Sequence, residues 1–299
     1  MKKDRETVSL MQASDKLFRK YPQLLLPIQE GISKTEEYKD AVLRGKKVNR
    51  EPEFFFPEKD QCFTCNTPAG VVEIILMSNR LVFERVYQAL AYRCEPTPVL
   101  PSVGAGFLSG LINWEKIHRH EEEYLASGKT DWPDEFKRFT ADKKNYTDTL
   151  ILLSSGPYSN IPAEWVGLQE EEWIQRSVRI RLYHELTHFI CRKFWPEKKD
   201  ALRDEIYADC IGLVAAFGNY DTYLAKMFLG IEKEQYRKGG RLEHYAPECT
   251  EEDIRTAMQW IEEAEGRTAA AWQQSRWKSL AETEQNKAIF DLIGKIYCQ

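Results

Sequence analysis

Five consecutive residues, His184-Glu185-Leu186-Thr187-His188, form an H-E-x-x-H motif. On a helix, residues four positions apart lie one above the other, so the two imidazoles can bind one metal ion from the same side. Glu185 lies about 100° around the helix from His184. From there it can reach a water molecule on the ion without binding the ion. The motif therefore predicts a catalytic Zn²⁺ site with His184 and His188 as ligands and Glu185 as general base.

The residues around the motif are typical of two consecutive helices. No proline or glycine occurs between Glu170 and Trp195, and Pro196 ends the first predicted helix because proline cannot continue it. A second helix is predicted from about Lys199 to Phe217, where Gly218-Asn219 ends it. The motif therefore lies on a long helix that a short turn connects to the next one.

Antiparallel packing of these two helices would supply a third ligand. The six residues from His188 to the first helix end, and the six from Lys199 to Glu205, each rise about 9 Å. This brings Glu205 level with His188, and it brings Asp209, one turn later, level with His184. Catalytic zinc usually has three protein ligands and one open position. We expect Glu205 to be the third ligand and Asp209 to accept the second N–H of His184 and fix its tautomer.

The H-E-x-x-H motif, a gap of sixteen residues and the E-x-x-x-D sequence from Glu205 to Asp209 together resemble the gluzincin zinc metallopeptidases, typified by thermolysin. The resemblance covers about Thr147 to Phe217. It implies the same ligands, the same general base and a supporting role for Asp209. The gap is a little shorter than in typical members, so the neighbouring Asp204 stays an alternative third ligand.

The related metzincin pattern does not fit. It would require glycine at position 191 and histidine at position 194, where the chain has Cys191 and Phe194. The gluzincin resemblance implies a zincin-like fold, with a small sheet and the active-site helix on one side, a helical lobe on the other, and a cleft between them.

The predicted chemistry is the hydrolysis of an amide bond. A zinc ion held by two imidazoles and one carboxylate keeps a net positive charge and lowers the pKa of bound water from 15.7 toward about 7. Glu185 would accept the proton and pass it to the leaving amine. The developing oxyanion requires a donor. His244 and Tyr245, after the flexible Gly239-Gly240, are the candidates, with ordinary loop residues as the alternative; Tyr207 would point toward the core.

Two other functions stay open. In one, the chain is a non-catalytic, zinc-stabilised scaffold or interaction module whose site is closed by a fourth protein ligand, such as Asp204 or a cysteine. In the other, it hydrolyses a non-peptide amide or ester. Glu185 favours an enzyme, because a structural zinc site would not require it. We therefore expect a zinc metallopeptidase with a peptide or protein substrate.

Composition limits the other classes of partner. The 299 residues include 42 Lys and Arg and 47 Asp and Glu, so the formal net charge is −5 and gives no electrostatic reason to expect nucleic acid. No apolar stretch approaches the roughly 20 residues of a membrane-spanning helix, and the first six residues do not resemble a secretory signal. Seven cysteines without repeating spacing favour reduced thiols in a cytoplasm. The sequence leaves the oligomeric state open.

The hydrophobic pattern predicts an α+β fold in three segments. Residues 1–60 form a helical N-terminal preamble, residues 61–195 an α+β lobe that ends in the H-E-x-x-H helix, and residues 196–299 a helical C-terminal lobe that carries the third ligand. The apolar, β-branched runs predict strands, and the helical periodicity predicts further helices. The strands are expected at Gly70–Met77 and Thr147–Ser154, and the helices at about Asn79–Arg93, Asn113–Ser127, from Thr250 onward and Arg276–Tyr297.

Three further patterns have simpler interpretations. Cys62 and Cys65 form a C-x-x-C that lacks the partners of a zinc knuckle or a redox motif, so coincidental thiols are favoured. His118 and His120 would point about 200° apart on a helix and belong to a solvated face. The glycine-rich segment 104–110 departs from the dinucleotide-binding fingerprint and is expected to be a loop.

Overall fold

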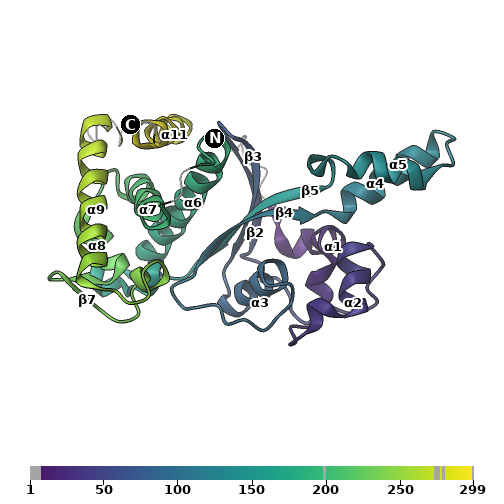
Figure 1. The fold of residues 1–299 in the computed structure, drawn as a ribbon, viewed down its shortest axis with the longest axis horizontal. Helices are drawn as coiled ribbons and strands as arrows, with labels where there is room; N and C mark the ends of the chain where they lie inside the picture. Colours follow the sequence, from purple (N-terminus) through teal and green to yellow (C-terminus); the bar gives the residue numbers. More distant parts are fainter. Residues whose placement is uncertain (1–7, 198–199, 273–276, 278–279, 298–299) are drawn as a thin grey trace. The chain divides into compact units, whose positions relative to one another are not determined.

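The computed structural model describes residues 8–197, 200–272, 277 and 280–297. The fold is α+β, as the sequence predicts, with one five-stranded sheet and a group of long helices (Figure 1). The chain forms two compact units. Unit 1 comprises residues 1–65, 72–99 and 106–154, and unit 2 comprises residues 66–71, 100–105 and 155–299. The H-E-x-x-H helix thus belongs with the helices that follow it, whereas the predicted segments placed a boundary after residue 195.

The sheet contains the two predicted strands as parallel neighbours. Strands β3 (Gly70–Met77) and β5 (Thr147–Ser154) pair with Glu73 opposite Leu150. The strand order is β1-β2-β3-β5-β4, and β1 pairs antiparallel with β2. The remaining strands are β1 (Val8–Ser9), β2 (Gln61–Thr67) and β4 (Ala105–Ile112).

Strand β4 corrects the expectation of a loop at residues 104–110. Glycine weakens strands, so this segment does not look like one in the sequence. Gly106 is required by packing, because a Cβ at this position would lie 2.5 Å from the ring of Tyr87. Strand β4 is at the edge of the sheet, next to β5.

Helices pack one face of the sheet into the core of unit 1. Ile75, Met77, Leu150 and Leu152 point to the same face and are fully buried with Phe83 and other residues of the surrounding helices. The helices of unit 1 are α1 (Leu10–Lys20), α2 (Glu36–Tyr38), α3 (Arg80–Ala91), α4 (Trp114–Ala126) and α5 (Trp132–Thr140), with single turns at Pro22–Leu25, Ile32–Lys34, Lys39–Leu43 and Lys143–Asn145.

Unit 2 is built around one central helix. Helix α7 (Ala201–Phe217) contacts α6 (Glu170–Phe194), α9 (Glu251–Ala271) and α11 (Glu282–Tyr297) (Figure 1). The unit also contains α8 (Thr222–Leu229), the short strands β6 (Ile231–Glu232) and β7 (Gln235–Tyr236), and the 3₁₀ turns η5 (Tyr158–Asn160), η6 (Ala163–Val166) and η7 (Arg241–His244).

Capping residues set the helix ends near the predicted positions. The Asp200 side chain accepts a hydrogen bond from the Arg203 N–H at the start of α7, and Thr250 forms the predicted capping box at the start of α9. The predicted helix starts at Lys199 and Arg276 lie outside the described residues. Gly218 ends α7 with a left-handed φ of 80°.

Helices α6 and α7 pack antiparallel, as the ligand geometry requires. Early residues of α6 meet late residues of α7: Arg176 donates to the Ala216 carbonyl, and His188 near the end of α6 meets Glu205 near the start of α7. At the crossing, Gly212 lies against Ile180, where an added Cβ would be 2.8 Å from the Ile180 carbonyl oxygen. The absence of a side chain at position 212 therefore allows the helices to approach closely.

We expect Gly212→Ala to destabilise the protein by about 1–3 kcal/mol, because the new methyl group overpacks this crossing. The matched control is Gly266→Ala on α9, where a Cβ would meet no atom within 4 Å. In an exposed helix interior, alanine should instead stabilise by about 0.5–1 kcal/mol. Urea unfolding measures both variants, and two changes of the same sign would contradict the close approach of α6 and α7.

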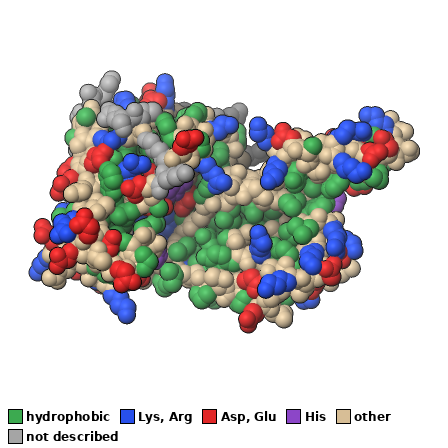
Figure 2. Space-filling model, viewed as in Figure 1, with side chains coloured by type: hydrophobic (Ala, Val, Ile, Leu, Met, Phe, Trp, Pro, Cys, Tyr) green, Lys and Arg blue, Asp and Glu red, His purple; other side chains and the backbone are tan. Residues whose placement is uncertain are grey.

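The surface carries charges of both signs. Acidic and basic side chains are interspersed on the face shown in Figure 2. Within the described ranges, no helix is long and apolar enough to cross a membrane.

Candidate metal centre

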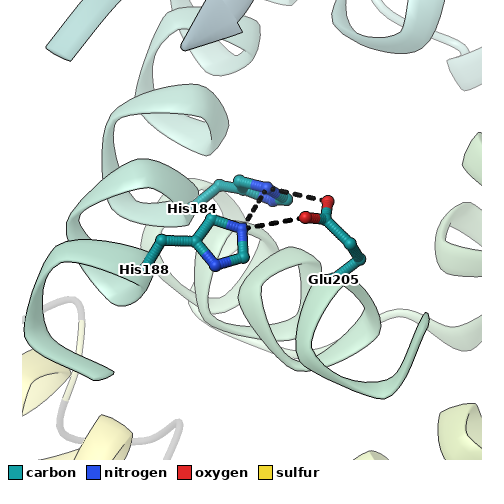
Figure 3. Close-up of side chains that lie close together, drawn as sticks. All are labelled: His184, His188 and Glu205. Carbon is teal, nitrogen blue, oxygen red and sulfur yellow. Dashed lines mark hydrogen bonds and ion pairs between the residues drawn. The ribbon is translucent and has the colours of Figure 1, made fainter. Parts of the chain in front are cut away.

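Three predicted ligands converge within unit 2. His184 and His188 extend from α6, and Glu205 faces them from α7 (Figure 3). The two Nε2 atoms lie 3.0 Å apart, and each is 3.2 Å from a carboxylate oxygen of Glu205. A tetrahedral zinc ion with bonds of about 2.0–2.1 Å needs ligand atoms about 3.3 Å apart. The three side chains are therefore close enough together to hold one metal ion.

The three ligand side chains differ in exposure. The His184 side chain is 7% exposed, whereas His188 and Glu205 are 24% and 21% exposed. Among the described residues these three form the one group with metal-ligand spacing, and neither Asp204 nor a described cysteine belongs to it. The described residues therefore supply three metal ligands, two of them on partly exposed side chains.

A buried carboxylate holds the other nitrogen of His184. Asp209 Oδ1 lies 2.8 Å from His184 Nδ1, and both residues are buried. The antiparallel register of α6 and α7 therefore brings Asp209 to the position that the sequence predicts for it. Such a carboxylate orients the imidazole of a metal ligand.

The charges of this group favour a cation. Burial lowers the pKa of His184, but hydrogen bonds to Asp209 and Glu205 outweigh burial and raise that pKa to about 10. Burial raises the pKa of Glu205, yet the two imidazoles hold it well below its usual range. Without a metal ion, the carboxylates therefore attract a proton to His184. A divalent cation would satisfy the same negative charge.

Glu185 lies beside the ligands without joining them. Its side chain is buried, and burial raises its pKa although His184 and His188 oppose this shift. Within the described part of the chain, Glu185 makes no hydrogen bond or ion pair. A carboxylate in this state is suited to accept and return a proton.

The structure separates the two candidate oxyanion donors. The Tyr245 hydroxyl donates a hydrogen bond of 2.8 Å to Glu205 Oε2, so Tyr245 is in contact with a ligand and its proton is engaged there. His244 is exposed, and its Nε2 lies 3.5 Å from the Ser102 hydroxyl. Tyr207 is buried and packs against the ring of Tyr297, away from the ligands, as expected.

Two buried residues of the site were missed by the sequence analysis. The Tyr158 hydroxyl donates to Asp209 Oδ1 at 2.6 Å, and Arg241 donates to the Tyr158 oxygen at 2.8 Å and to Asp209 Oδ2. Burial would raise the pKa of Asp209, but Arg241 and His184 lower it to about 2. The one available signal was that Arg241 lies in the same short segment as His244 and Tyr245.

The other potential ligands lie elsewhere. The Cys62 thiol donates to Glu73 at 3.2 Å, and burial raises its pKa to about 12. His118 is exposed, as expected for a solvated face, but His120 stacks on Phe139 with ring centroids 4.1 Å apart. Cys298 lies outside the described residues.

The fold and the site define an α+β protein with a candidate His-His-Glu metal centre. The chain belongs to a family described as "Family of unknown function (DUF7005)", whose model matches residues 5–295. No curated protein and no solved structure matches the chain.

Proposed function

We propose that this protein is a zinc-dependent metallohydrolase of the gluzincin type that cleaves amide bonds in a peptide or protein substrate. One observation carries the proposal: the Nε2 atoms of His184 and His188 lie 3.0 Å apart, and each lies 3.2 Å from a different oxygen of the Glu205 carboxylate, with Asp209 behind His184. A zincin-like interpretation of the α+β fold is consistent with this site.

Each site residue then has a defined task. A bound zinc ion supplies Lewis acidity, which lowers the pKa of water and polarises the substrate carbonyl. Glu185 accepts the proton of the attacking water and returns it to the leaving amine. Asp209 orients His184, and the Tyr245 hydroxyl orients Glu205. The residues of this chain thus account for binding, orientation and proton transfer.

The number of ligands and the buried Glu185 favour an enzyme over a scaffold. A structural zinc site usually has four protein ligands, whereas the group within the described ranges has three. A structural site also gives no reason to bury a carboxylate without a partner next to the ligands, because burial of a charge is costly. The choice of an amide substrate rests on the gluzincin resemblance.

We expect the chelator-treated wild-type protein to bind about one zinc ion per chain. Zinc at 100 times its dissociation constant should stabilise the folded state by about 2.7 kcal/mol. His188→Ala should bind less than about a tenth of a zinc ion, because it removes one of three ligands. Metal analysis after dialysis and thermal unfolding with added zinc measure both effects.

The matched control for this experiment is His118→Ala, which removes another helix histidine outside the site. This variant should bind zinc like the wild type. Wild-type protein that takes up no zinc, or a His188→Ala variant that binds as much as the control, would refute the metal centre.

A further inference from the structure

One face of α6 carries more than the metal ligands. Trp173, Ser177, Arg181, His184 and His188 follow each other at spacings of four, four, three and four residues, so they form a single stripe along the helix. The first three are buried and do not reach the ligand atoms. They bind instead the segment 156–161 that precedes the helix.

Each of the three side chains fixes a different part of this segment. The Trp173 indole donates to the Ile161 carbonyl at 2.7 Å. The Ser177 hydroxyl accepts from the Tyr158 N–H at 2.9 Å. Arg181 donates to the carbonyls of residues 156 and 157. The backbone of the segment is therefore tied to the same helix face that presents the two histidines.

The segment has an unusual backbone that these bonds can maintain. Ser159 and Asn160 have φ values of 50° and 57°, in the left-handed region that non-glycine residues rarely adopt. Such residues persist where the surrounding contacts determine them. The residue that precedes them, Tyr158, extends its side chain to α6 and α7, where its hydroxyl lies 2.6 Å from Asp209 Oδ1 and 3.2 Å from His184 Nδ1.

The hydrogen bonds of this network determine which group donates at Tyr158, Asp209 and His184 Nδ1. Arg241 can only donate, so the Tyr158 oxygen accepts from Arg241. The single proton of Tyr158 then goes to Asp209, whose carboxylate forms an ion pair with Arg241 and can only accept. The Tyr158 hydroxyl has no second proton to donate to His184, and Asp209 can only accept, so Nδ1 of His184 carries a proton and donates it to Asp209. Nε2 is therefore the nitrogen of His184 that can offer a lone pair to a metal ion.

We infer that Tyr158 is a positioning residue of the metal centre: held by the α6 stripe and by Arg241, it fixes Asp209 and the tautomer of His184 that binds metal. This inference rests on the proposed metal centre. In this interpretation, the segment 156–161 orients the metal ligand His184 on the helix α6 that follows it.

The test is Tyr158→Phe, which removes the hydroxyl and keeps the ring that packs edge-on against Phe228. Loss of a residue that supports a ligand typically lowers metal affinity 10- to 100-fold. We expect the zinc dissociation constant to rise by this factor. The visible absorption spectrum of the Co²⁺-loaded protein should change, because His184 is no longer held in one orientation. Ser177→Ala, which releases the Tyr158 backbone, should shift both readouts in the same direction.

The matched control is Tyr183→Phe. Tyr183 is also a buried tyrosine, it lies on α6 next to His184, and its hydroxyl donates to Asn286. This control should keep the wild-type zinc affinity and Co²⁺ spectrum. Equal affinities and spectra for Tyr158→Phe and wild type would overturn the positioning role and leave the metal centre intact. Equal losses in both tyrosine variants would overturn it as well, since they would indicate general destabilisation. A wild-type protein that binds neither metal would refute the proposed function itself.

Discussion

Glu185→Gln is expected to bind one zinc ion per chain and to hydrolyse amide bonds about 10²–10⁴ times more slowly than wild type, the usual contribution of a positioned acid–base group. Glutamine has nearly the same shape, but it cannot accept the proton of the attacking water. The three ligands and Asp209 are untouched, so the affinity for zinc should not change. This separation of binding from turnover is what distinguishes an enzyme from a zinc-stabilised scaffold.

A peptide library, assayed with and without chelator, measures the turnover, and metal analysis measures the zinc. Glu171→Gln is the matched control, because Glu171 is another glutamate of α6 but is exposed. It should keep full activity. Wild-type turnover in Glu185→Gln would rule out Glu185 as the base. If the wild type hydrolysed only non-peptide amides, the protein would be a hydrolase of non-peptide amides and not a peptidase.

The positions of the three proposed ligands, His184, His188 and Glu205, could be predicted from the geometry of two helices. Four-residue spacing places His184 and His188 on one face, and a short turn after Pro196 makes the next helix return antiparallel. The rise per residue then fixes the level of Glu205 and Asp209. These steps need only the start and end of two long helices, so the sequence was sufficient.

The two residues that hold Asp209, Tyr158 and Arg241, could not be predicted, because no periodic pattern in the sequence places them near it. Tyr158 is 26 residues before His184, and Arg241 is 32 residues after Asp209. Tyr158 is followed by two left-handed residues, and Arg241 lies in a single 3₁₀ turn. Neither local conformation follows from the helical or strand periodicity of the sequence. The same reason explains β4, where packing of Tyr87 against Gly106 overrides the low strand preference of glycine.

Arg241→Met is expected to destabilise the metal-free protein by about 3–5 kcal/mol, because removing one partner of a buried ion pair leaves an uncompensated charge. Arg241 and Asp209 are both buried, and the guanidinium also donates to Tyr158. Asp209→Asn should also be destabilising, because it leaves the buried positive charge of Arg241 without a partner. Urea unfolding of chelator-treated protein measures each change.

The double variant decides whether the two residues act as a pair. Combining Arg241→Met with Asp209→Asn removes both charges, so the loss should be smaller than the sum of the single losses by about 1–3 kcal/mol. Arg237→Met is the control: it breaks an ion pair with Glu232 that is partly exposed, and such pairs contribute about 0–1 kcal/mol. Additive losses, or an Arg241→Met loss no greater than that of the control, would mean that the buried pair does not hold Asp209 behind His184. Coupled losses would mean that Arg241 balances the charge of the carboxylate that holds His184 Nδ1.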